Sequence, residues 1–494
     1  MKKAIVIGGG FGGIAAALRA RAKGYAVDLY CNQPLLGGRA QVYQRDGYVF
    51  DAGPTVMTAP FLFEELFGLF GKRLEDYAEL VPVEPWYQFR FPDGNHFNYG
   101  GTLENLLEEI RRISPVDVDN YLRMLEHSKA IFEVGFEKLA TQPFNRFRGM
   151  VKTVPDLVRL QSYKSVWQLV CQYIHHPLLR QAFSVQPLLV GGNPLDTTSI
   201  YCLIHYLERK WGVHYVLGGT GQLVQAFARL MSEEGIRVSL NSPVKSIHIE
   251  KGRASGIRLA NGESHASDIV ISNIDPQFLY RHMIPKGQQG LIGTCKTLLT
   301  KPSMGLFVLY FGTKCRYDNL PHHTIMMPRA YEAILNNIFN HKCLSEDLAL
   351  YLHRPTATDK SIAPEGHDAF YCLCPVPNLS AGIDWNKEAN PLVSRIINAL
   401  EALGMPGLSK QIDTLFFKTP EDFKTDYNAY LGSGFSAAPV FFQSAWFRHH
   451  NQAEGIENLY LVGAGTHPGA GVPGVISSAK VVERLLPDVL EPVE

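Results

Sequence analysis

The sequence predicts an α/β protein built around a Rossmann-like dinucleotide-binding domain, and three features support this prediction. The run Lys3-Ala-Ile-Val-Ile-Gly8 is apolar and β-rich, as in a parallel strand that is buried on both faces. Five glycines within 8–13 follow this strand directly. A second apolar run, 459–462, leads into another glycine-rich turn near the end of the chain. Because both patterns place a glycine turn between a strand and a helix, they predict one domain assembled from distant segments.

Length and composition predict a multi-domain globular protein. The 494 residues are too many for one hydrophobic core, and 46% of them are apolar while 19% are charged. Lys and Arg together number 47, as do Asp and Glu, and this balance argues against broad electrostatic recognition of nucleic acid. We therefore expect two or three domains and no nucleic acid partner.

The cysteines and the first residues predict a cytoplasmic protein. The eight cysteines are scattered without a CxxC pair, which favours free thiols in a reducing compartment and no zinc or iron–sulfur site. The sequence has no run of about 18 apolar residues, so no membrane-spanning helix is expected. The start Met1-Lys2-Lys3 resembles a signal peptide, but the glycines at 8–13 fit a turn better than a secretory helix.

A βαβ unit is predicted at the start of the chain. An alanine-rich helix from about 12 to 23 should follow the first strand and stop at Gly24, and Tyr25–Cys31 fits the second strand. Residues 64–210 then have a mostly helical pattern with few strand signals. The helices expected in this region include 103–113, 117–139 and 156–174.

Short strands dominate the middle of the chain, and a mixed region follows. Asn261-Gly262 is a strong hairpin signal among strands expected at 236–240, 244–250, 253–259 and 268–272. Further on we expect strands at 306–311 and 370–373, a helix at 391–403 and a last helix at about 474–486. These patterns divide the chain into a discontinuous dinucleotide-binding domain at 1–75, 220–290 and 441–494, a mainly helical region at 76–219 and a mixed α/β substrate domain at 291–440.

The first glycine run fits the pattern G-x-G-x-x-G, with Gly8, Gly10 and Gly13 in its three fixed positions. Gly8 permits the tight turn, and Gly10 lets a pyrophosphate approach the backbone. Gly13 lets the helix pack closely on the strand while its N-terminus faces the phosphates. Its position directly after a buried strand makes a dinucleotide site the preferred interpretation.

The acidic ribose ligand that normally accompanies this pattern is missing. It is expected about 20 residues further on, at the end of the second strand. Cys31 and Asn32 stand there, and the nearby acid, Asp28, lies three residues before Cys31. Cysteine is a poor partner for a ribose diol, so we expect this contact to be lost or taken over by Asn32.

Two further glycine motifs favour FAD over NAD. The run Gly37-Gly38-Arg39-Ala40 lies too near the first motif for an NAD enzyme to need it. In flavoenzymes the ribityl and phosphate chain runs close to the backbone of such a glycine pair, and an arginine adds positive charge at the pyrophosphate. The C-terminal turn adds Gly463, Gly465, Gly469 and Gly471 before a helix whose N-terminus can face an anionic reduced flavin.

These motifs together resemble the bacterial-type phytoene desaturases of carotenoid biosynthesis, over essentially the whole chain. The resemblance rests on Gly-Gly-Arg-Ala40, Phe50-Asp-Ala-Gly-Pro-Thr55, Leu189-Val-Gly-Gly-Asn193, Gly218-Gly-Thr-Gly221 and the run 458–475. It implies FAD-dependent desaturation of phytoene to more conjugated carotenes such as lycopene or neurosporene. It also implies a flavin domain of the amine-oxidase and p-hydroxybenzoate-hydroxylase type, and a substrate domain with a helical part that faces the membrane.

The resemblance implies cofactor-binding roles for individual residues but no catalytic residue. The pyrophosphate would be held by Gly8, Gly10, Gly13, Gly37, Gly38 and Arg39. The residues near the flavin would be Gly53, Pro54 and Thr55, and the adenine contact would be Val244. The ribityl chain and isoalloxazine would be flanked by Gly465, Thr466, Gly471, Val472 and Pro473. The family usually carries Glu at the position of Cys31, so this chain departs from the family pattern there.

The implied substrate, a long polyene hydrocarbon, has no group for hydrogen bonding, so we expect a long apolar channel to bind it. Loss of an allylic hydride would leave a cation delocalised over the polyene, and a strong base is then unnecessary. The hypothesis is hydride transfer to FAD, proton loss to a weak base or water, and reoxidation of the flavin by oxygen or a quinone.

Three histidine motifs are candidates for chemistry, but the sequence favours structural or solvated roles for all of them. His467 lies in a Thr-His-Pro turn inside the flavin motif, where a structural role is commoner than a catalytic one. The pairs His322-His323 and His449-His450 lack carboxylate or cysteine spacing for a metal site. We interpret both pairs as solvated loop residues.

A basic, amphipathic segment between 143 and 180 is the candidate membrane contact. Its six basic residues include Arg146, Arg148 and Lys152. Arg148 and Lys152 are candidates for the entrance of the substrate channel. An apolar stripe recurs at helical spacing at Leu157, Leu160, Tyr163, Trp167, Val170 and Ile174. Such a stripe fits a core-facing helix or a helix on an anionic membrane. Because the implied substrate is collected from lipid, we expect a cytoplasmic protein that associates peripherally with the membrane.

Other functions on related scaffolds stay open at this point. They include a carotene isomerase, a carotenoid ketolase, a hydroxycarotenoid desaturase and a desaturase of the shorter squalene-like series. An amine oxidase is less favoured, because the C-terminal motif resembles the desaturases more closely. A different class of protein, a flavin-free lipid carrier similar to Rab GDP-dissociation inhibitors, also stays open, because Cys31 replaces the expected acidic ribose ligand.

Overall fold

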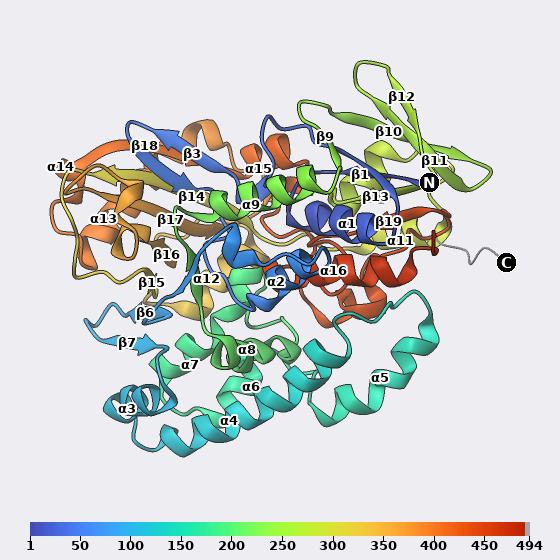
Figure 1. The fold of residues 1–494 in the computed structure, drawn as a ribbon. Helices are drawn as coiled ribbons and strands as arrows, with labels where there is room; N and C mark the ends of the chain where they lie inside the picture. Colours follow the sequence, from blue (N-terminus) through green and yellow to red (C-terminus); the bar gives the residue numbers. More distant parts are fainter. Residues whose placement is uncertain (490–494) are drawn as a thin grey trace.

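A five-stranded parallel sheet forms the centre of the dinucleotide-binding domain (Figure 1). The computed structural model describes residues 1–489, apart from the side chain of Arg148. In the sheet the strand order is β19-β13-β1-β2-β9, and every neighbouring pair is parallel. The strands are β1 (Lys3–Ile7), β2 (Ala26–Tyr30), β9 (Arg237–Ser239), β13 (Ile269–Ser272) and β19 (Leu459–Leu461). The sheet therefore joins the beginning, the middle and the end of the chain, as the sequence predicts.

Helices with small side chains cover this sheet. The helix α1 (Phe11–Ala22) packs against α16 (Val472–Leu485), and its alanines at 15, 16, 17 and 20 are buried. Small side chains allow the two helix axes to approach the sheet and each other closely, which places both helix N-termini beside the strand ends. The helices α2 (Phe61–Gly68) and α9 (Thr220–Glu233) complete this core.

A seven-stranded mixed sheet forms the second centre of the molecule (Figure 1). Its order is β18-β14-β17-β16-β15-β6-β7, and β6 and β15 are its parallel pair. The strands are β6 (Tyr87–Arg90), β7 (His96–Tyr99), β14 (Gly305–Thr313), β15 (His323–Met326), β16 (Leu350–His353), β17 (Asp368–Val376) and β18 (Ile412–Lys418). The helix α13 (Trp385–Ala402) packs against one face, and the other face belongs to the largest aromatic core.

The segment 64–210 is mostly helical, as predicted, but it contains three short strands whose positions were not predicted. Besides β6 and β7, the segment contains β5 (Leu80–Pro82), which pairs with β8 (His214–Val216). The alternating aromatic residues Tyr87, Phe89 and Phe97 are buried, and Pro92-Asp93-Gly94 forms the turn between their strands. The strands are short, and β6 finds its partner β15 more than 200 residues away, so their local signal is weak.

A layer of helices lies below the two sheets in Figure 1. It contains α3 (Leu103–Ile113), α4 (Asp117–Phe132), α5 (Phe147–Arg159), α6 (Val166–Tyr173), α7 (Pro177–Ser184) and α8 (Leu203–Trp211). The π-helical segment Glu133–Lys138 continues α4, so the helix expected at 117–139 is confirmed.

The prediction of one helix at 156–174 is wrong, because two helices, α5 and α6, share this segment. The helix α5 ends before Gln161, whose φ of 54° lies in the left-handed region and stops the helix. Ser165 then begins α6 with a capping box. The predicted apolar stripe is therefore split, with Leu157 on α5, Val170 on α6 and the exposed Tyr163 in the turn between them.

The remaining elements are small. They are the hairpin β3 (Val42–Arg45) and β4 (Tyr48–Asp51), the antiparallel sheet β10 (Val244–Glu250), β11 (Arg253–Leu259) and β12 (Ser264–Ala266), and the helices α10 (Pro276–Phe278), α11 (Leu291–Leu299), α12 (Tyr331–Asn336), α14 (Leu408–Gln411) and α15 (Pro420–Tyr427). Among residues 1–489, no helix is both long and apolar enough to cross a bilayer. All eight cysteines are free thiols.

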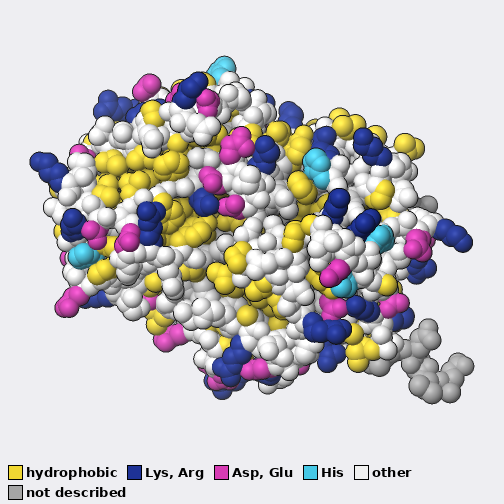
Figure 2. All heavy atoms as spheres, turned by 90° about the horizontal axis from the view of Figure 1, so that it is seen from above, with side chains coloured by type: hydrophobic (Ala, Val, Ile, Leu, Met, Phe, Trp, Pro, Cys, Tyr) yellow, Lys and Arg dark blue, Asp and Glu magenta, His cyan; other side chains and the backbone are white. Residues whose placement is uncertain are grey.

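Charges of both signs are mixed on the face seen in Figure 2. Basic and acidic side chains alternate there with apolar ones, and neither sign gathers into one large area. This distribution agrees with the balanced composition of the chain.

Candidate functional site

A cavity of about 510 Å³ lies where the parallel sheet, the mixed sheet and the helical layer meet. It reaches from the glycine turn after β1 to the aromatic core, and most of its lining is apolar. Twelve of the fifteen residues predicted to bind the cofactor line it: Gly8, Gly10, Gly37, Gly38, Arg39, Gly53, Pro54, Thr55, Gly465, Gly471, Val472 and Pro473.

The turn between β1 and α1 forms one end of the cavity. Gly8 has a φ of 96°, which favours glycine, and Gly10 is the N-cap of α1. No described side chain caps this helix, so its first backbone N–H groups are available to an anion. A Cβ atom on Gly13 would lie 1.9 Å from the Gly8 carbonyl oxygen. Gly13 therefore supports the turn from behind and does not line the cavity.

The second glycine pair lies directly against the first. The Gly37 N–H donates to the Gly9 carbonyl over 2.8 Å, and a Cβ atom on Gly38 would lie 3.2 Å from the Gly10 Cα. Side chains at these positions would fill the space between the two turns. The contact leaves a narrow groove of backbone, which is suited to an extended pyrophosphate and ribityl chain.

Arg39 supplies a positive charge beside this groove. Its side chain is half-buried and donates from Nη2 to the Ser433 carbonyl over 3.4 Å, while its buried Nε has no hydrogen-bond partner within 1–489. Burial lowers the pKa of Arg39, and the Asp275 carboxylate counteracts this effect. A buried N–H without a partner fits an anionic or carbonyl oxygen of a bound group. The residues present therefore fit FAD.

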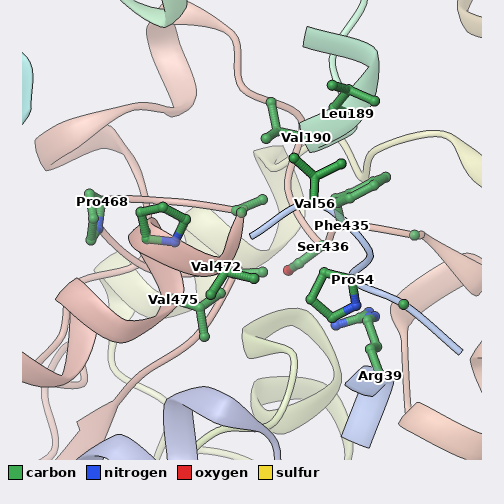
Figure 3. A pocket seen from close by; sticks show the side chains of 18 of the residues that line it. Arg39, Pro54, Val56, Leu189, Val190, Phe435, Ser436, Pro468, Val472 and Val475 are labelled. Carbon is green, nitrogen blue, oxygen red and sulfur yellow. The ribbon is translucent and has the colours of Figure 1, made fainter. Parts of the chain in front are cut away.

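The C-terminal turn forms the opposite wall. Gly471, with a φ of 89°, is the N-cap of α16, and Val472 and Pro473 begin the helix. Figure 3 shows Val472 and Val475 on one side of the space, with Arg39 and Pro54 across from them. The N-terminus of α16, like that of α1, lacks a capping side chain in the described chain and points its positive end into the site.

Two more of the predicted residues lie outside the lining. Thr466 is fully buried, and its hydroxyl donates to the Gly463 carbonyl over 3.0 Å. Val244 begins β10, two residues after Ser242, whose N–H donates to the Cys31 carbonyl. Thr466 thus stabilises the turn, and Val244 lies near the predicted adenosine end without reaching the cavity. Its contact with adenine remains a prediction.

No acidic side chain is available to bind the ribose at the end of β2 within the described residues. The Cys31 thiol is buried, while Asn32 and Gln33 also line the cavity. Asp28 forms ion pairs with Lys3 and Arg237 and does not line the cavity, so it is a structural carboxylate. Asn32 and Gln33 are the polar side chains available at the position where the ribose is expected.

Several residues that line the cavity were not predicted from the sequence. Asn273 and Asp275 follow β13, and Phe435 and Ser436 lie near Pro54 (Figure 3). Asn273 touches the groove so closely that a Cβ atom on Gly12 would lie 2.6 Å from its Oδ1. The Asn-Ile-Asp-Pro sequence after a buried strand was the available signal, because strand ends of a parallel sheet meet at one edge.

The interpretation of His322 and His323 as solvated residues is wrong. Both are buried with His353, and nitrogen atoms of the three rings lie within 4.8 Å of one another. His323 Nδ1 lies 2.8 Å from the Tyr351 hydroxyl, which lies 2.6 Å from the Thr55 hydroxyl at the cavity wall. Burial lowers the pKa of each of the three histidines well below its usual range. They are neutral, and they are buried because β15 and β16 lie inside the mixed sheet.

The pair His449-His450 is also buried, which corrects the same interpretation. Both side chains lie within 3.7 Å of the buried Glu454 carboxylate, which also pairs with Lys296 over 3.1 Å. These partners outweigh burial and hold the pKa of Glu454 well below its usual range. The cluster holds α11 against the segment 449–454, which precedes the C-terminal turn.

His467 has a structural contact, in keeping with the favoured interpretation. Its Nε2 lies 2.9 Å from the Leu139 carbonyl oxygen, and its ring packs on Phe144. Burial lowers its pKa to about 4, so the ring is neutral at physiological pH. His467 lines the cavity but is held in place by the helical layer.

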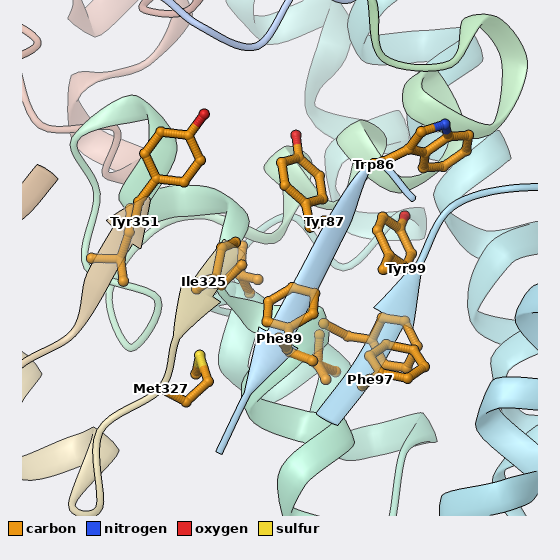
Figure 4. Packing of buried hydrophobic residues seen from close by; sticks show 14 of the residues in the cluster. Trp86, Tyr87, Phe89, Phe97, Tyr99, Ile325, Met327 and Tyr351 are labelled. Atoms are coloured by element: carbon orange, nitrogen blue, oxygen red, sulfur yellow. The ribbon is translucent and has the colours of Figure 1, made fainter. Parts of the chain in front are cut away.

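A buried carboxyl group lies at the aromatic side of the cavity. Glu208 accepts a hydrogen bond from the Tyr87 hydroxyl over 2.9 Å, and its Oε2 has no partner among the described residues. In Figure 4 the hydroxyl groups of Tyr87, Tyr99 and Tyr351 point in the same direction. Burial raises the pKa of Glu208 to about 7, despite the opposing hydrogen bonds from the tyrosines.

Glu208→Gln is expected to change how stability depends on pH. The folded protein binds this proton more tightly than the unfolded chain, whose carboxyl pKa is 4.5. The contribution of Glu208 is therefore most favourable below pH 4.5 and is lost as the pH rises to about 7, by about 3 kcal/mol. Thermal melts at pH 5 and pH 8 should show a smaller pH-dependent loss in Glu208→Gln than in the wild type.

The exposed Glu388→Gln is the matched control, because it makes the same chemical change without altering a buried group. It should follow the wild type at both pH values. Equal pH dependence in Glu208→Gln and the wild type would contradict the raised pKa.

The site and fold define the class of protein. Two uncapped helix N-termini, two glycine turns in contact and a half-buried arginine form a dinucleotide cradle that opens into an apolar cavity. A flavin-dependent oxidoreductase of the amine-oxidase type has this combination, with FAD as its cofactor.

Comparisons with known proteins agree with this class. The family model of flavin-containing amine oxidoreductases matches residues 11–343. A lycopene-forming phytoene desaturase of Pantoea ananas is 46% identical and covers 98% of this chain and 99% of its own length. A neurosporene-forming phytoene desaturase of Cereibacter sphaeroides is 39% identical, with 98% and 95% covered. The chain belongs to the phytoene desaturase family of flavin-containing amine oxidoreductases.

Solved structures share the fold at low sequence identity. An oxidoreductase from Methanosarcina mazei has a TM-score of 0.65 at 17% identity and covers 98% of this chain and all of its own. A putrescine oxidase bound to putrescine has a TM-score of 0.63 at 11% identity, with 98% of each chain covered. These likenesses confirm the predicted amine-oxidase-type fold.

Proposed function

We propose that this protein carries out FAD-dependent desaturation of phytoene to lycopene or neurosporene, and that the apolar part of the 510 Å³ cavity is its substrate channel. The observation that carries the proposal is that this apolar part is continuous with the glycine cradle in one cavity. A hydrocarbon in the apolar part would meet a flavin whose phosphates lie in the cradle. The high identity to lycopene-forming and neurosporene-forming desaturases supports the same assignment.

Each part of the cavity has a separate task in this proposal. The cradle residues Gly8, Gly10 and Gly38 hold the pyrophosphate, and Arg39 neutralises part of its charge. Val472 and Pro473 would flank the flavin ring, and Pro54 and Thr55 would also lie near it. When bound, FAD supplies the acceptor for the hydride that leaves the substrate. The apolar walls orient the chain and exclude water from the reacting carbon atoms. The proton that follows goes to a weak base or to water.

Phytoene-loaded liposomes provide the test of this function. Purified protein is added with and without FAD, in air and under anaerobic conditions with or without a quinone, and the polyene absorption is followed. New long-wavelength bands that require FAD are expected, and the arm that sustains them identifies oxygen or quinone as the acceptor. Bound FAD without new bands would favour a different carotenoid substrate, and failure to bind FAD would favour the lipid carrier.

An exposed apolar face beside the cavity is the proposed membrane contact. On α5, Phe147, Val151, Val154 and Val158 are exposed at helical spacing, although Met150 and Leu157 of the same helix line the cavity. Lys152 is exposed between them. One face of this helix would contact lipid and the other would line the substrate channel. A hydrocarbon could then pass directly from the bilayer into the channel.

A second helix extends the same face. Leu291, Ile292, Leu298 and Leu299 of α11 are exposed, as is Phe442. Trp446 connects the two helices, because its ring lies 5.1 Å from that of Phe147 and its carbonyl accepts a hydrogen bond from Lys296. The apolar character of the face suits a peripheral membrane contact. It favours a cytoplasmic protein that docks on the bilayer.

The triple variant Val151→Ser, Val154→Ser, Val158→Ser is expected to bind liposomes on the order of tenfold more weakly, because three apolar side chains would no longer enter the lipid. Sedimentation with anionic liposomes measures the bound fraction. Val238→Ser with Leu240→Ser is the control, since both side chains are exposed apolar residues outside this face. Equal binding by the triple variant and the wild type would contradict the proposed contact.

A further inference from the structure

The side chain of Tyr331, the first residue of α12, forms part of the lining of the main cavity. Tyr331 also lines a second cavity of about 390 Å³, whose lining includes Trp167, Pro177, Arg180 and Glu332. Pro177 and Glu332 are exposed, so this second cavity faces the solvent. Among the described residues, Tyr331 is the one that lines both cavities.

Tyr331 is held firmly in this position. Only 5% of its surface is exposed, and its hydroxyl lies 3.2 Å from the Ser184 hydroxyl. Its ring packs against Trp167, with 5.7 Å between the ring centroids. Contacts at both the ring and the hydroxyl make this side chain a wall between the apolar channel and the solvent-facing cavity.

The depth of a closed channel matters for a chain that reacts at several bonds. All of these bonds must reach the same flavin, so the polyene must slide to a different depth for each one. The space beyond the flavin limits how much of the leading end can pass, and it thereby limits which bonds can react. We propose that Tyr331 is the stop for the leading end of the polyene and a specificity-determining residue for the number of desaturation steps. This inference rests on the proposed function of the cavity.

The test compares the products of two variants with those of the wild type. Tyr331→Ala removes the ring and joins the two cavities, so bonds further from the leading end should reach the flavin. We expect the ratio of the most desaturated product to the less desaturated ones to rise by about twofold or more. Tyr331→Phe keeps the ring but loses the hydroxyl contact with Ser184, and it should keep the wild-type product ratio. Products are separated by chromatography and identified by absorption, and bound FAD is measured in each variant.

Three outcomes would overturn the inference. They are an unchanged product ratio in Tyr331→Ala at wild-type FAD content, loss of turnover in that variant with FAD retained, or the same shift in Tyr331→Phe. If Tyr331→Ala fails to fold, Tyr331→Leu removes the aromatic wall with a smaller loss of volume, and the same criteria apply. Failure of the wild type to desaturate phytoene would instead count against the proposed function.

Discussion

Gly13→Ala is expected to abolish FAD binding. A Cβ atom at this position would lie 1.9 Å from the Gly8 carbonyl oxygen, so α1 must move away from β1. The clash is between backbone and Cβ, and no side-chain rotation relieves it. The movement displaces the N–H groups that face the phosphates, and overpacking costs about 1–3 kcal/mol of folding free energy. The ratio of flavin to protein absorbance should fall to near zero, and the melting temperature should fall.

The matched control is Gly68→Ala. Gly68 ends α2 and is exposed, and a methyl group added to its Cα would have no described atom within 4 Å. Alanine there should leave FAD content unchanged and stability equal or slightly higher, because alanine favours helix. Stoichiometric FAD in purified Gly13→Ala would show that the turn tolerates a side chain, and the assignment of the cradle would be wrong.

Arg39→Ala is expected to weaken FAD binding by about a hundredfold. The Arg39 side chain lines the cavity, and its buried Nε lacks a partner within the described chain. A charge-assisted hydrogen bond to a partly buried phosphate contributes about 1.5–3 kcal/mol, so its loss corresponds to a change of this size in affinity. Titration of the apoprotein with FAD, followed by flavin fluorescence, measures the effect.

Two further variants separate charge from geometry. Arg39→Lys keeps the charge but loses the planar fork of donors, so an intermediate affinity is expected. Arg45→Ala removes an arginine that is 52% exposed, and it should bind FAD like the wild type. Wild-type affinity in Arg39→Ala would remove this arginine from the cofactor site.

The glycine motifs were predictable because their function depends on short-range geometry. A strand, a turn with a positive φ at Gly8 and a helix are consecutive in the chain, so the pattern of residues specifies the local structure. The same holds for Gly37 and Gly471. Twelve predicted residues line the cavity for this reason, and Gly13 supports the turn as predicted.

The failed predictions concern features that depend on distant partners. The strands β6 and β7 are short, and β6 is stabilised by pairing with β15, far away in the sequence. The helix expected at 156–174 breaks near Gln161 and Ser165, where a cap and a positive φ outweigh the apolar spacing. His322 and His323 looked solvated because nothing local shows that β15 lies inside a sheet.

Local sequence was enough to specify the dinucleotide cradle, the choice of FAD and the family, because glycine turns and strand–helix order are properties of consecutive residues. The side chains that surround the substrate cavity are set instead by tertiary packing. Tyr87 of β6, Glu208 of α8 and Tyr331 of α12 line the cavity together, and the buried His322, His323 and His353 lie at β15 and β16 of the mixed sheet. Burial, pKa and the shape of a cavity depend on atoms from all of these segments at once, and no single stretch of sequence contains that information.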